Sequence, residues 1–363
     1  MNLDARMIID LDVFHHNVTT ILKETEASVL FVLKGNAYGH GYRVIAQELA
    51  GYERIVFLGV ATPQEAMYLQ PFTSKPIVVL GYTHTPQLND LVQRGIIPTI
   101  FTYEQARHIH VSGSVFLNVD TGFHRLGQPI SEQYRSDILA IQAMSHLNVL
   151  GVFTHLALRD KHVDEGRIQS FLTWVEAFRI PYLSISDSIA FVRYNTTENL
   201  FRMGALMFGL QSERDSHRLD VIPTTKLIAT VTRVQQISQA CEVFYRAQVA
   251  ANRTIATVQI GYGDGLFRTM AEDAYALIGG ISCKYIEVGM DQTLFDVTGG
   301  NVQVGDEVVI FDAHNLPLST FASWCNTNKN NVLVNMSHRV QRQYWRQGRL
   351  VATEGLGGYQ NEQ

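Results

Sequence analysis

Cysteine and charged residues are scarce in this sequence, and each shortage argues against a class of protein. The three cysteines, Cys241, Cys283 and Cys325, lie far apart and form no CxxC pair. This argues against a disulfide framework or a zinc site and is typical of a reducing cytosol. Charged residues make up 17%, and acidic residues outnumber basic ones by 34 to 29, a formal net charge of −5. A basic groove for nucleic acid is therefore not expected.

Three further features are missing. No apolar run reaches the roughly 18–20 residues of a membrane span, and the stretch Met1–Asp12 lacks the basic start of a signal peptide. His15-His16 and His108-x-His110 have no third ligand at a suitable spacing, so no metal site is expected. We therefore expect a cytoplasmic protein without a membrane or nucleic-acid partner. Its 363 residues, 46% of them hydrophobic, are enough for two folded domains.

Residues 1–222 repeat one unit, a short apolar run followed by a segment with helical spacing. Continuous apolar runs are typical of strands buried on both faces, and alternation with helices predicts a parallel sheet. Eight such units predict a (β/α)8 TIM barrel. A doubly wound open sheet is the alternative, but it usually has fewer strands, and no GxGxxG follows the first run. The runs are Val29–Leu33, Ile55–Val60, Pro76–Leu80, Ile96–Phe101, Val115–Val119, Val149–Thr154, Tyr182–Ser186 and Met203–Phe208.

Residues 223–363 have a different texture. Strand-like runs follow one another closely, with glycine and aspartate turns between them, which predicts a mostly-β second domain. One helix is expected over Leu318–Trp324. The strand-like runs are Leu227–Val234, Thr254–Ile260, Tyr275–Ile278, Gln292–Val297, Glu307–Phe311 and Asn331–Val334.

Reactive side chains stand where the predicted barrel strands end, which is where barrels of this kind carry their active sites. Lys34 directly follows the apolar run, and Arg125, His155 and Ser188 follow later strands. Burial lowers the pKa of a lysine, and a lysine with a lowered pKa is suited to forming a Schiff base. The alternative is a lysine that merely extends from a strand end to solvent.

The stretch Val32-Leu33-Lys34-Gly35-Asn36-Ala37-Tyr38-Gly39-His40-Gly41 resembles the V-K-A-N-A-Y-G-H-G motif of the alanine racemase family. Further matches follow in order along nearly the whole chain. They are Val119-Asp120-Thr121-Gly122 with Arg125-Leu126-Gly127, Thr154-His155, Arg202-x-Gly204, Val243-Phe244-Tyr245, Gly261-Tyr262-Gly263-Asp264-Gly265 and Met290-Asp291-Gln292. The resemblance implies a pyridoxal 5′-phosphate enzyme with an N-terminal barrel and a C-terminal β domain that supplies a second base.

The resemblance also implies a role for each matched residue. Lys34 would hold pyridoxal phosphate as a Schiff base and act as one base, and Tyr245 would be the base on the opposite face. Because tyrosine from a partner subunit completes the site in this family, a homodimer with shared active sites is implied. The other cofactor residues would be Tyr38, Ser188 and the N–H groups of Gly204 and Ala205 at the phosphate, Arg202 at the pyridine nitrogen, and His155 between Arg202 and Tyr245. The substrate residues would be Arg125 and the Met290 backbone at the carboxylate, with Tyr262 and Asp291 lining the entrance.

Each role has a structural alternative. His155 is a candidate core histidine, Arg202 a salt-bridge partner of Glu198, Ser188 a helix cap and Tyr245 a core residue of the β domain. Amino-acid decarboxylases with a barrel and a β domain are a different enzymatic class, but their glycine-rich phosphate loop and cysteine-centred motif are missing. A barrel protein that binds the cofactor without turnover is the non-catalytic alternative.

Three positions depart from the family pattern. Asn118 replaces a lysine that is often carbamylated, which removes a negative charge beside Arg125. His338 replaces a tyrosine that reaches the phosphate and crowds the substrate side chain, and Arg246 follows Tyr245 where glycine is usual. The resemblance leads us to expect interconversion of L- and D-alanine. Because of the departures, a serine-preferring or broad-specificity racemase, or a cofactor-bound relative with little activity, stays an alternative.

Overall fold

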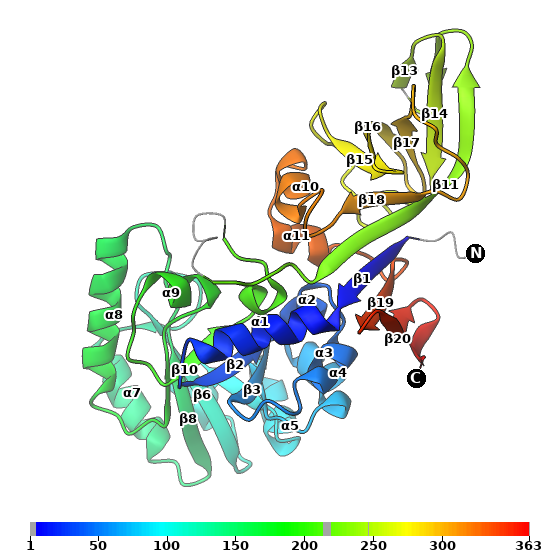
Figure 1. The fold of residues 1–363 in the computed structure, drawn as a ribbon. Coiled ribbons are helices and arrows are strands. Elements are labelled where there is room, and N and C mark those ends of the chain that lie inside the picture. Colours follow the sequence, from blue (N-terminus) through cyan, green and yellow to red (C-terminus); the bar gives the residue numbers. More distant parts are fainter. Residues whose placement is uncertain (1–4, 213–218, 246, 363) are drawn as a thin grey trace. The chain divides into compact units, whose positions relative to one another are not determined.

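The structure is a computed structural model that describes residues 5–212, 219–245 and 247–362. It divides into two compact units (Figure 1). The barrel unit contains Val18–Met207 and Gln211–Val221, and the C-terminal unit contains Met1–Asn17, Phe208–Leu210 and Ile222–Gln363. The first 17 residues therefore group differently from the predicted division into 1–222 and 223–363. The reason is strand β1 (Arg6–Asp10), which pairs in the C-terminal unit as described below.

Eight parallel strands build the barrel unit, in the order β10-β2-β3-β4-β5-β6-β8-β9. The backbone N–H of Arg202 in β10 donates to the carbonyl of Ser186, just beyond β9, at 3.0 Å and so brings the first and last strands together. The predicted TIM-like barrel is confirmed. The strands are β2 (Ser28–Val32), β3 (Ile55–Val60), β4 (Ile77–Val79), β5 (Ile97–Ile100), β6 (Gly113–Asp120), β8 (Leu147–Phe153), β9 (Tyr182–Ser184) and β10 (Leu200–Met203), and the short β7 (Gln128–Pro129) pairs with β6.

The last barrel strand was predicted too late in the chain. The run Met203–Phe208 is wrong as a strand, because β10 ends at Met203 and a 3-10 turn covers Ala205–Phe208. The cause is local. The N–H groups of Gly204 and Leu206 donate to the Ser188 hydroxyl, at 3.1 and 3.4 Å, so the backbone leaves the sheet at Gly204.

Helices follow most barrel strands, and side-chain caps fix where several of them begin. Asp160 accepts a hydrogen bond from the N–H of Val163 at the start of α8, and Ser131 accepts one from Tyr134 at the start of α7. α1 (Leu11–Lys23) follows β1, and α2 (Lys34–Tyr38) is a left-handed turn. The other helices are α3 (Tyr42–Glu48), α4 (Pro63–Leu69), α5 (Leu88–Gln93), α6 (Tyr103–Arg107), α7 (Glu132–Gln142), α8 (Lys161–Val175) and α9 (Ser188–Arg193).

Apolar side chains fill the inside of the barrel. Phe57 lies edge-on to Phe116, with ring centroids 5.5 Å apart, and Phe153 is buried in the same cluster with Val78. Burial of each such side chain contributes roughly 1.5–3 kcal/mol. The strand ends, and the polar residues that follow them, are therefore held on a rigid base.

The C-terminal unit is built from antiparallel strands, and six of them close into a barrel because the long strand β11 pairs with both β18 and β14. β1 pairs with β11 antiparallel and with β19 parallel. The strands are β11 (Thr225–Ile237), β12 (Cys241–Val243), β13 (Ala247–Val249), β14 (Arg253–Val258), β15 (Tyr275–Ile278), β16 (Ile281–Val288), β17 (Thr293–Asp296), β18 (Glu307–Phe311), β19 (Gln341–Arg346), β20 (Arg349–Gly355) and β21 (Gly358–Asn361).

Two helices interrupt this unit. The helix predicted over Leu318–Trp324 is confirmed as α10. The strand predicted over Asn331–Val334 is wrong, because these residues belong to α11 (Lys329–Val334). The side chain of Asn328 accepts a hydrogen bond from the N–H of Asn331 at 2.9 Å, and this cap starts a helix in spite of the β-branched residues that follow. In the described part of the chain, no helix combines the length and apolarity needed to cross a bilayer.

Candidate active site

Lys34 begins a short left-handed turn at the end of β2. Gly35, Asn36, Ala37 and Tyr38 have φ values of 64°, 54°, 54° and 52°. This conformation costs each residue other than glycine roughly 1–2 kcal/mol, so contacts with the rest of the protein must stabilise it. Within the turn, the N–H of Ala37 donates to the carbonyl of Leu33 at 2.7 Å. Tyr38, at the end of the turn, packs against the apolar cluster that contains Leu30 and Val32 of β2.

Glu65 anchors this turn from the neighbouring α4. Its carboxylate accepts hydrogen bonds from the N–H groups of Gly35 at 2.8 Å and Ala61 at 2.7 Å. It also closes a capping box with Thr62. The sequence reasoning did not assign Glu65 to the site. The signal that marks it is the spacing Thr62-x-x-Glu65, which identifies the helix start but not its link to Gly35.

Four residues with predicted phosphate roles lie together in the barrel unit. The Tyr38 hydroxyl accepts a hydrogen bond from the N–H of Ala205, and burial raises the pKa of Tyr38. The Ser188 hydroxyl accepts from the N–H of Gly204 at 3.1 Å. A Cβ atom on Gly204 would lie 2.5 Å from the Tyr38 hydroxyl, so only glycine fits there. The cap of α9 is the carboxylate of Asp187, not Ser188.

Arg202 is buried in β10 and donates to neutral oxygens. Its guanidinium contacts the Ser184 hydroxyl and the Thr154 carbonyl, both at 2.6 Å. Burial lowers the pKa of Arg202 to about 10, partly offset by the negative charge of Glu198. The Glu198 carboxylate itself accepts hydrogen bonds from the backbone of Ser186. Arg202 is thus fixed through carbonyl and hydroxyl groups, and Glu198 supports it as a nearby charge.

Burial and nearby positive charges act on Lys34 and His155. Lys34 as a whole residue is exposed. The protein nevertheless partly desolvates its amine, which lowers the pKa of Lys34, and the charge of Arg125 lowers this pKa further. Desolvation, followed by the charge of Arg202, lowers the pKa of His155 to about 4. Both groups are therefore held closer to their neutral forms than in water. A neutral amine is the form that accepts a proton.

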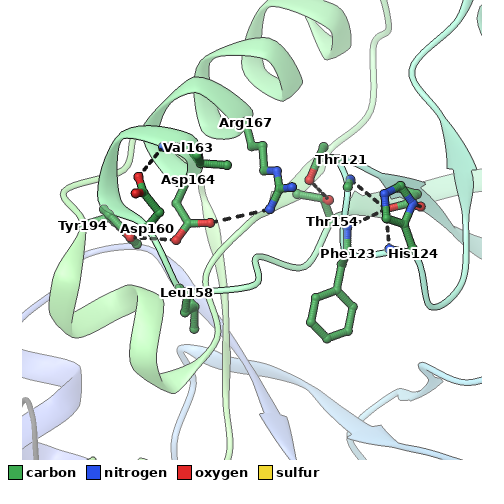
Figure 2. Close-up of polar contacts among 12 residues, drawn as sticks. Thr121, Phe123, His124, Thr154, Leu158, Asp160, Val163, Asp164, Arg167 and Tyr194 are labelled. Carbon is green, nitrogen blue, oxygen red and sulfur yellow. Dashed lines mark hydrogen bonds and ion pairs between the residues drawn. The ribbon is translucent and has the colours of Figure 1, made fainter.

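The loop after β6 carries Arg125. The Asp120 carboxylate accepts hydrogen bonds from the N–H groups of Gly122, Phe123 and His124 at 2.8, 2.9 and 3.1 Å. Figure 2 shows this loop beside Thr154 and near α8, with the ion pair between Asp164 and Arg167. The Arg125 guanidinium lies over the Phe123 ring, 4.8 Å from its centroid. Sequence reasoning did not assign Phe123 a role.

Asn118 lies in the strand behind this loop and is buried. Its amide donates to the carbonyl of Phe153 at 3.2 Å. The backbone of Gly127 packs against its side-chain oxygen, since a Cβ atom on Gly127 would lie 2.3 Å from it. The amide is thus occupied by local contacts.

The remaining predicted residues lie in the C-terminal unit. The N–H of Tyr262 donates to the carbonyl of Gly289 at 2.9 Å, beside Met290, and Asp291 pairs with Arg339 at 2.7 Å. The N–H of Tyr245 donates to Glu287 at 3.1 Å. Tyr245, Tyr262, Met290, Asp291 and His338 are all exposed. The alternative that Tyr245 is a core residue of the β domain is therefore wrong. Arg246 lies outside the described residues.

Comparison with known proteins agrees with this geometry. Residues 9–212 match the model of the alanine racemase N-terminal domain, and residues 224–344 match that of the alanine racemase C-terminal domain. An alanine racemase of Desulforamulus reducens is 30% identical, over 93% of this chain and 97% of its own. An amino-acid racemase of Enterococcus faecalis is 28% identical, over 93% of this chain and 51% of its own.

Solved structures share the complete fold. An alanine racemase from Clostridium difficile 630 has a TM-score of 0.91 and 25% identity, with 98% of this chain and 99% of that one covered. The Bartonella henselae alanine racemase with covalently bound pyridoxal phosphate has a TM-score of 0.83 at 22% identity, with 94% and 99% covered. A barrel with a lysine at a strand end and a second β domain defines a class of pyridoxal-phosphate enzymes. Within that class, this chain belongs to the alanine racemase family.

Proposed function

We propose that this protein is a pyridoxal-phosphate-dependent racemase that interconverts L- and D-alanine. The observation that carries the proposal is the group formed by Tyr38, Ser188, Gly204 and Ala205 close to the turn that starts at Lys34. The N–H groups of Gly204 and Ala205 donate to the Ser188 and Tyr38 hydroxyls, and Gly204 packs against Tyr38, so these groups lie together. Hydroxyls and backbone N–H groups are suited to binding a phosphate. Relatives in this family use pyridoxal phosphate, which supports the assignment.

These residues fit that cofactor in chemistry as well as in position. Lys34 would hold it through its amine. Arg202 would lie at the ring nitrogen, where a guanidinium donates a hydrogen bond but keeps its proton more firmly than an acid does. The cofactor, when bound, would supply an electron sink for the charge left at the substrate Cα. Limited protonation of the ring would restrict side reactions of that carbon.

Racemisation needs two bases on opposite faces of the substrate. The lowered pKa of Lys34 increases the neutral fraction of its amine, so the Nζ atom can accept the Cα proton on one face. The Tyr245 hydroxyl would exchange a proton on the other face. Arg125 would bind the substrate carboxylate, with the Met290 backbone as the second contact. Tyr262 and Asp291 would line the entrance for the substrate.

Because Tyr245 is exposed on the C-terminal unit, we propose that it acts in the site of a second copy. The enzyme would then be a homodimer with shared active sites. The expected cytoplasmic location stays a prediction from the sequence.

A direct test incubates purified protein with L-alanine in deuterated water. Inversion is followed by circular dichroism, and Cα–H exchange is followed by NMR. Wild-type protein should be yellow, and it should exchange and invert alanine. Lys34→Ala should lose both the colour and the activity, whereas Lys161→Ala, an exposed lysine on α8, should keep both. A colourless wild-type protein, or a yellow one that never exchanges the proton, would refute the proposal.

His338 favours a second candidate, a racemase that prefers serine or accepts several amino acids. Histidine is shorter than the tyrosine of relatives, and its ring carries two nitrogen atoms where the tyrosine ring has only carbon, so a wider and more polar pocket is expected. The amino-acid racemase of Enterococcus faecalis supports this breadth within the family. Turnover of L-alanine, L-serine and longer amino acids should shift toward alanine in His338→Tyr. An unchanged preference would remove this candidate.

A further inference from the structure

We propose that Phe123 is the positioning residue that holds Arg125 in place for the substrate carboxylate. The proposal rests on the function assigned to Arg125 above. It adds a residue that the family motif does not supply, and it concerns only the barrel unit.

The contacts of Arg125 favour this assignment. Within the described residues, Arg125 has no hydrogen bond and no ion pair, and its guanidinium lies over the Phe123 ring, 4.8 Å from the ring centroid. Asn118, at the position of the often carbamylated lysine of relatives, is a neutral amide that donates to Phe153. Across residues 5–212, 219–245 and 247–362, no carboxylate pairs with the guanidinium, and the aromatic face of Phe123 supports it instead.

The ring itself is fixed on a second side. Phe123 lies edge-on to His155, with centroids 4.7 Å apart and an angle of 88° between the rings. The neighbouring hydroxyls of Thr121 and Thr154 are 2.9 Å apart (Figure 2). This contact and the ring contact together join the loop to the segment that carries His155. The ring can thus act as a fixed support.

The loop backbone adds to this rigidity. Three N–H groups, including that of Phe123, donate to Asp120. Gly122 has a φ of 110° and lies under the Arg167 side chain, where a Cβ atom would approach the guanidinium to 2.7 Å. A guanidinium placed over a supported ring loses less freedom when a carboxylate binds, and this reduction in cost raises affinity.

The test compares Phe123→Leu with Phe123→Tyr. Leucine keeps apolar volume but removes the aromatic face, and tyrosine keeps the face. In Phe123→Leu, the KM for alanine should rise about two- to fivefold, as an exposed cation–π contact predicts, with kcat changed much less. The Kd for propionate, a carboxylate without an amine, should rise by a similar factor. Phe123→Tyr should restore both values.

Phe72 provides a matched control. Its ring lies under Arg43 at 5.2 Å and contacts the Tyr68 ring edge-on at 5.8 Å, an arrangement of the same kind away from the site. Phe72→Leu should leave KM, kcat and propionate binding unchanged. An equal change in Phe72→Leu, an unchanged Phe123→Leu, or a Phe123→Tyr as impaired as leucine would overturn the proposal.

Failure of the proposed function can be told apart from failure of this inference. Propionate binding, measured by calorimetry, does not need turnover. Loss of binding in Arg125→Met with no change in Phe123→Leu would keep the carboxylate role and remove the role of Phe123. Wild-type protein that does not bind propionate, or Arg125→Met that binds it normally, would remove both.

Discussion

The N–H of Gly35 donates a hydrogen bond to the Glu65 carboxylate at 2.8 Å, so a residue of α4 holds the backbone next to Lys34. The other oxygen of the same carboxylate accepts from Ala61. In Glu65→Gln, the amide nitrogen would face one of these two donors. We expect the free energy of unfolding to fall by about 1–3 kcal/mol, measured by urea denaturation.

Glu104 offers the matched control for this substitution. It is also an acid in the first turn of a helix, but it is exposed and forms a surface ion pair with Arg107 at 3.2 Å. Glu104→Gln should change stability by less than about 0.5 kcal/mol. If the two variants lost equal stability, the anchoring role of Glu65 would be wrong.

The barrel was predictable from the sequence because its strands are continuous apolar runs, and β3 (Ile55–Val60) has the predicted bounds. Local hydrogen bonds determine the structure of the two segments that were predicted wrongly. Ser188 bends the chain at Gly204, and Asn328 starts a helix over a run with β-branched residues. The role of Glu65 was not predicted because it depends on a contact between α4 and the turn after β2, which periodicity does not encode. The role of Phe123 was not predicted because the loop conformation that stacks Arg125 on its ring cannot be read from the sequence. The residue roles taken from the resemblance stay predictions.

Arg202 should contribute to the stability of the barrel independently of any ligand. Arg202→Met would leave the Thr154 carbonyl and the Ser184 hydroxyl without their donor, in a buried position. We expect a loss of about 3 kcal/mol in the free energy of unfolding. Arg125→Met is the control, because Arg125 is exposed, and it should cost less than about 1 kcal/mol. Comparable losses in both variants would argue against the structural role.

His155 should make the ligand-free protein less stable in acid. Its pKa is about 4 in the folded protein, below the unfolded value near 6.5. The unfolded chain therefore binds more protons between these values, and stability falls as the pH is lowered through that window. The loss from this group is at most about 3 kcal/mol, reduced by partial exposure to solvent.

The measurement for His155 is urea unfolding at several values between pH 7 and pH 4. In His155→Gln the stability should depend less steeply on pH over this range, while His108→Gln, on the surface, should follow the wild type. Identical slopes in wild type and His155→Gln would show that the imidazole is not desolvated as described.

The proposed dimer can be tested by combining two inactive variants in one dimer. Lys34→Ala and Tyr245→Phe should each be inactive, since each removes one of the two proposed bases from every site. A mixed dimer would contain one intact site, with Lys34 from one copy and Tyr245 from the other. Random exchange of the two variants puts about half the dimers in the mixed form, each with one working site, so activity should return to about a quarter of wild type. The subunits are exchanged by unfolding the mixed variants and refolding them together. Lys34→Ala taken alone through the same unfolding and refolding is the control. If the mixture stays inactive although mass spectrometry detects mixed dimers, the two bases do not come from different subunits.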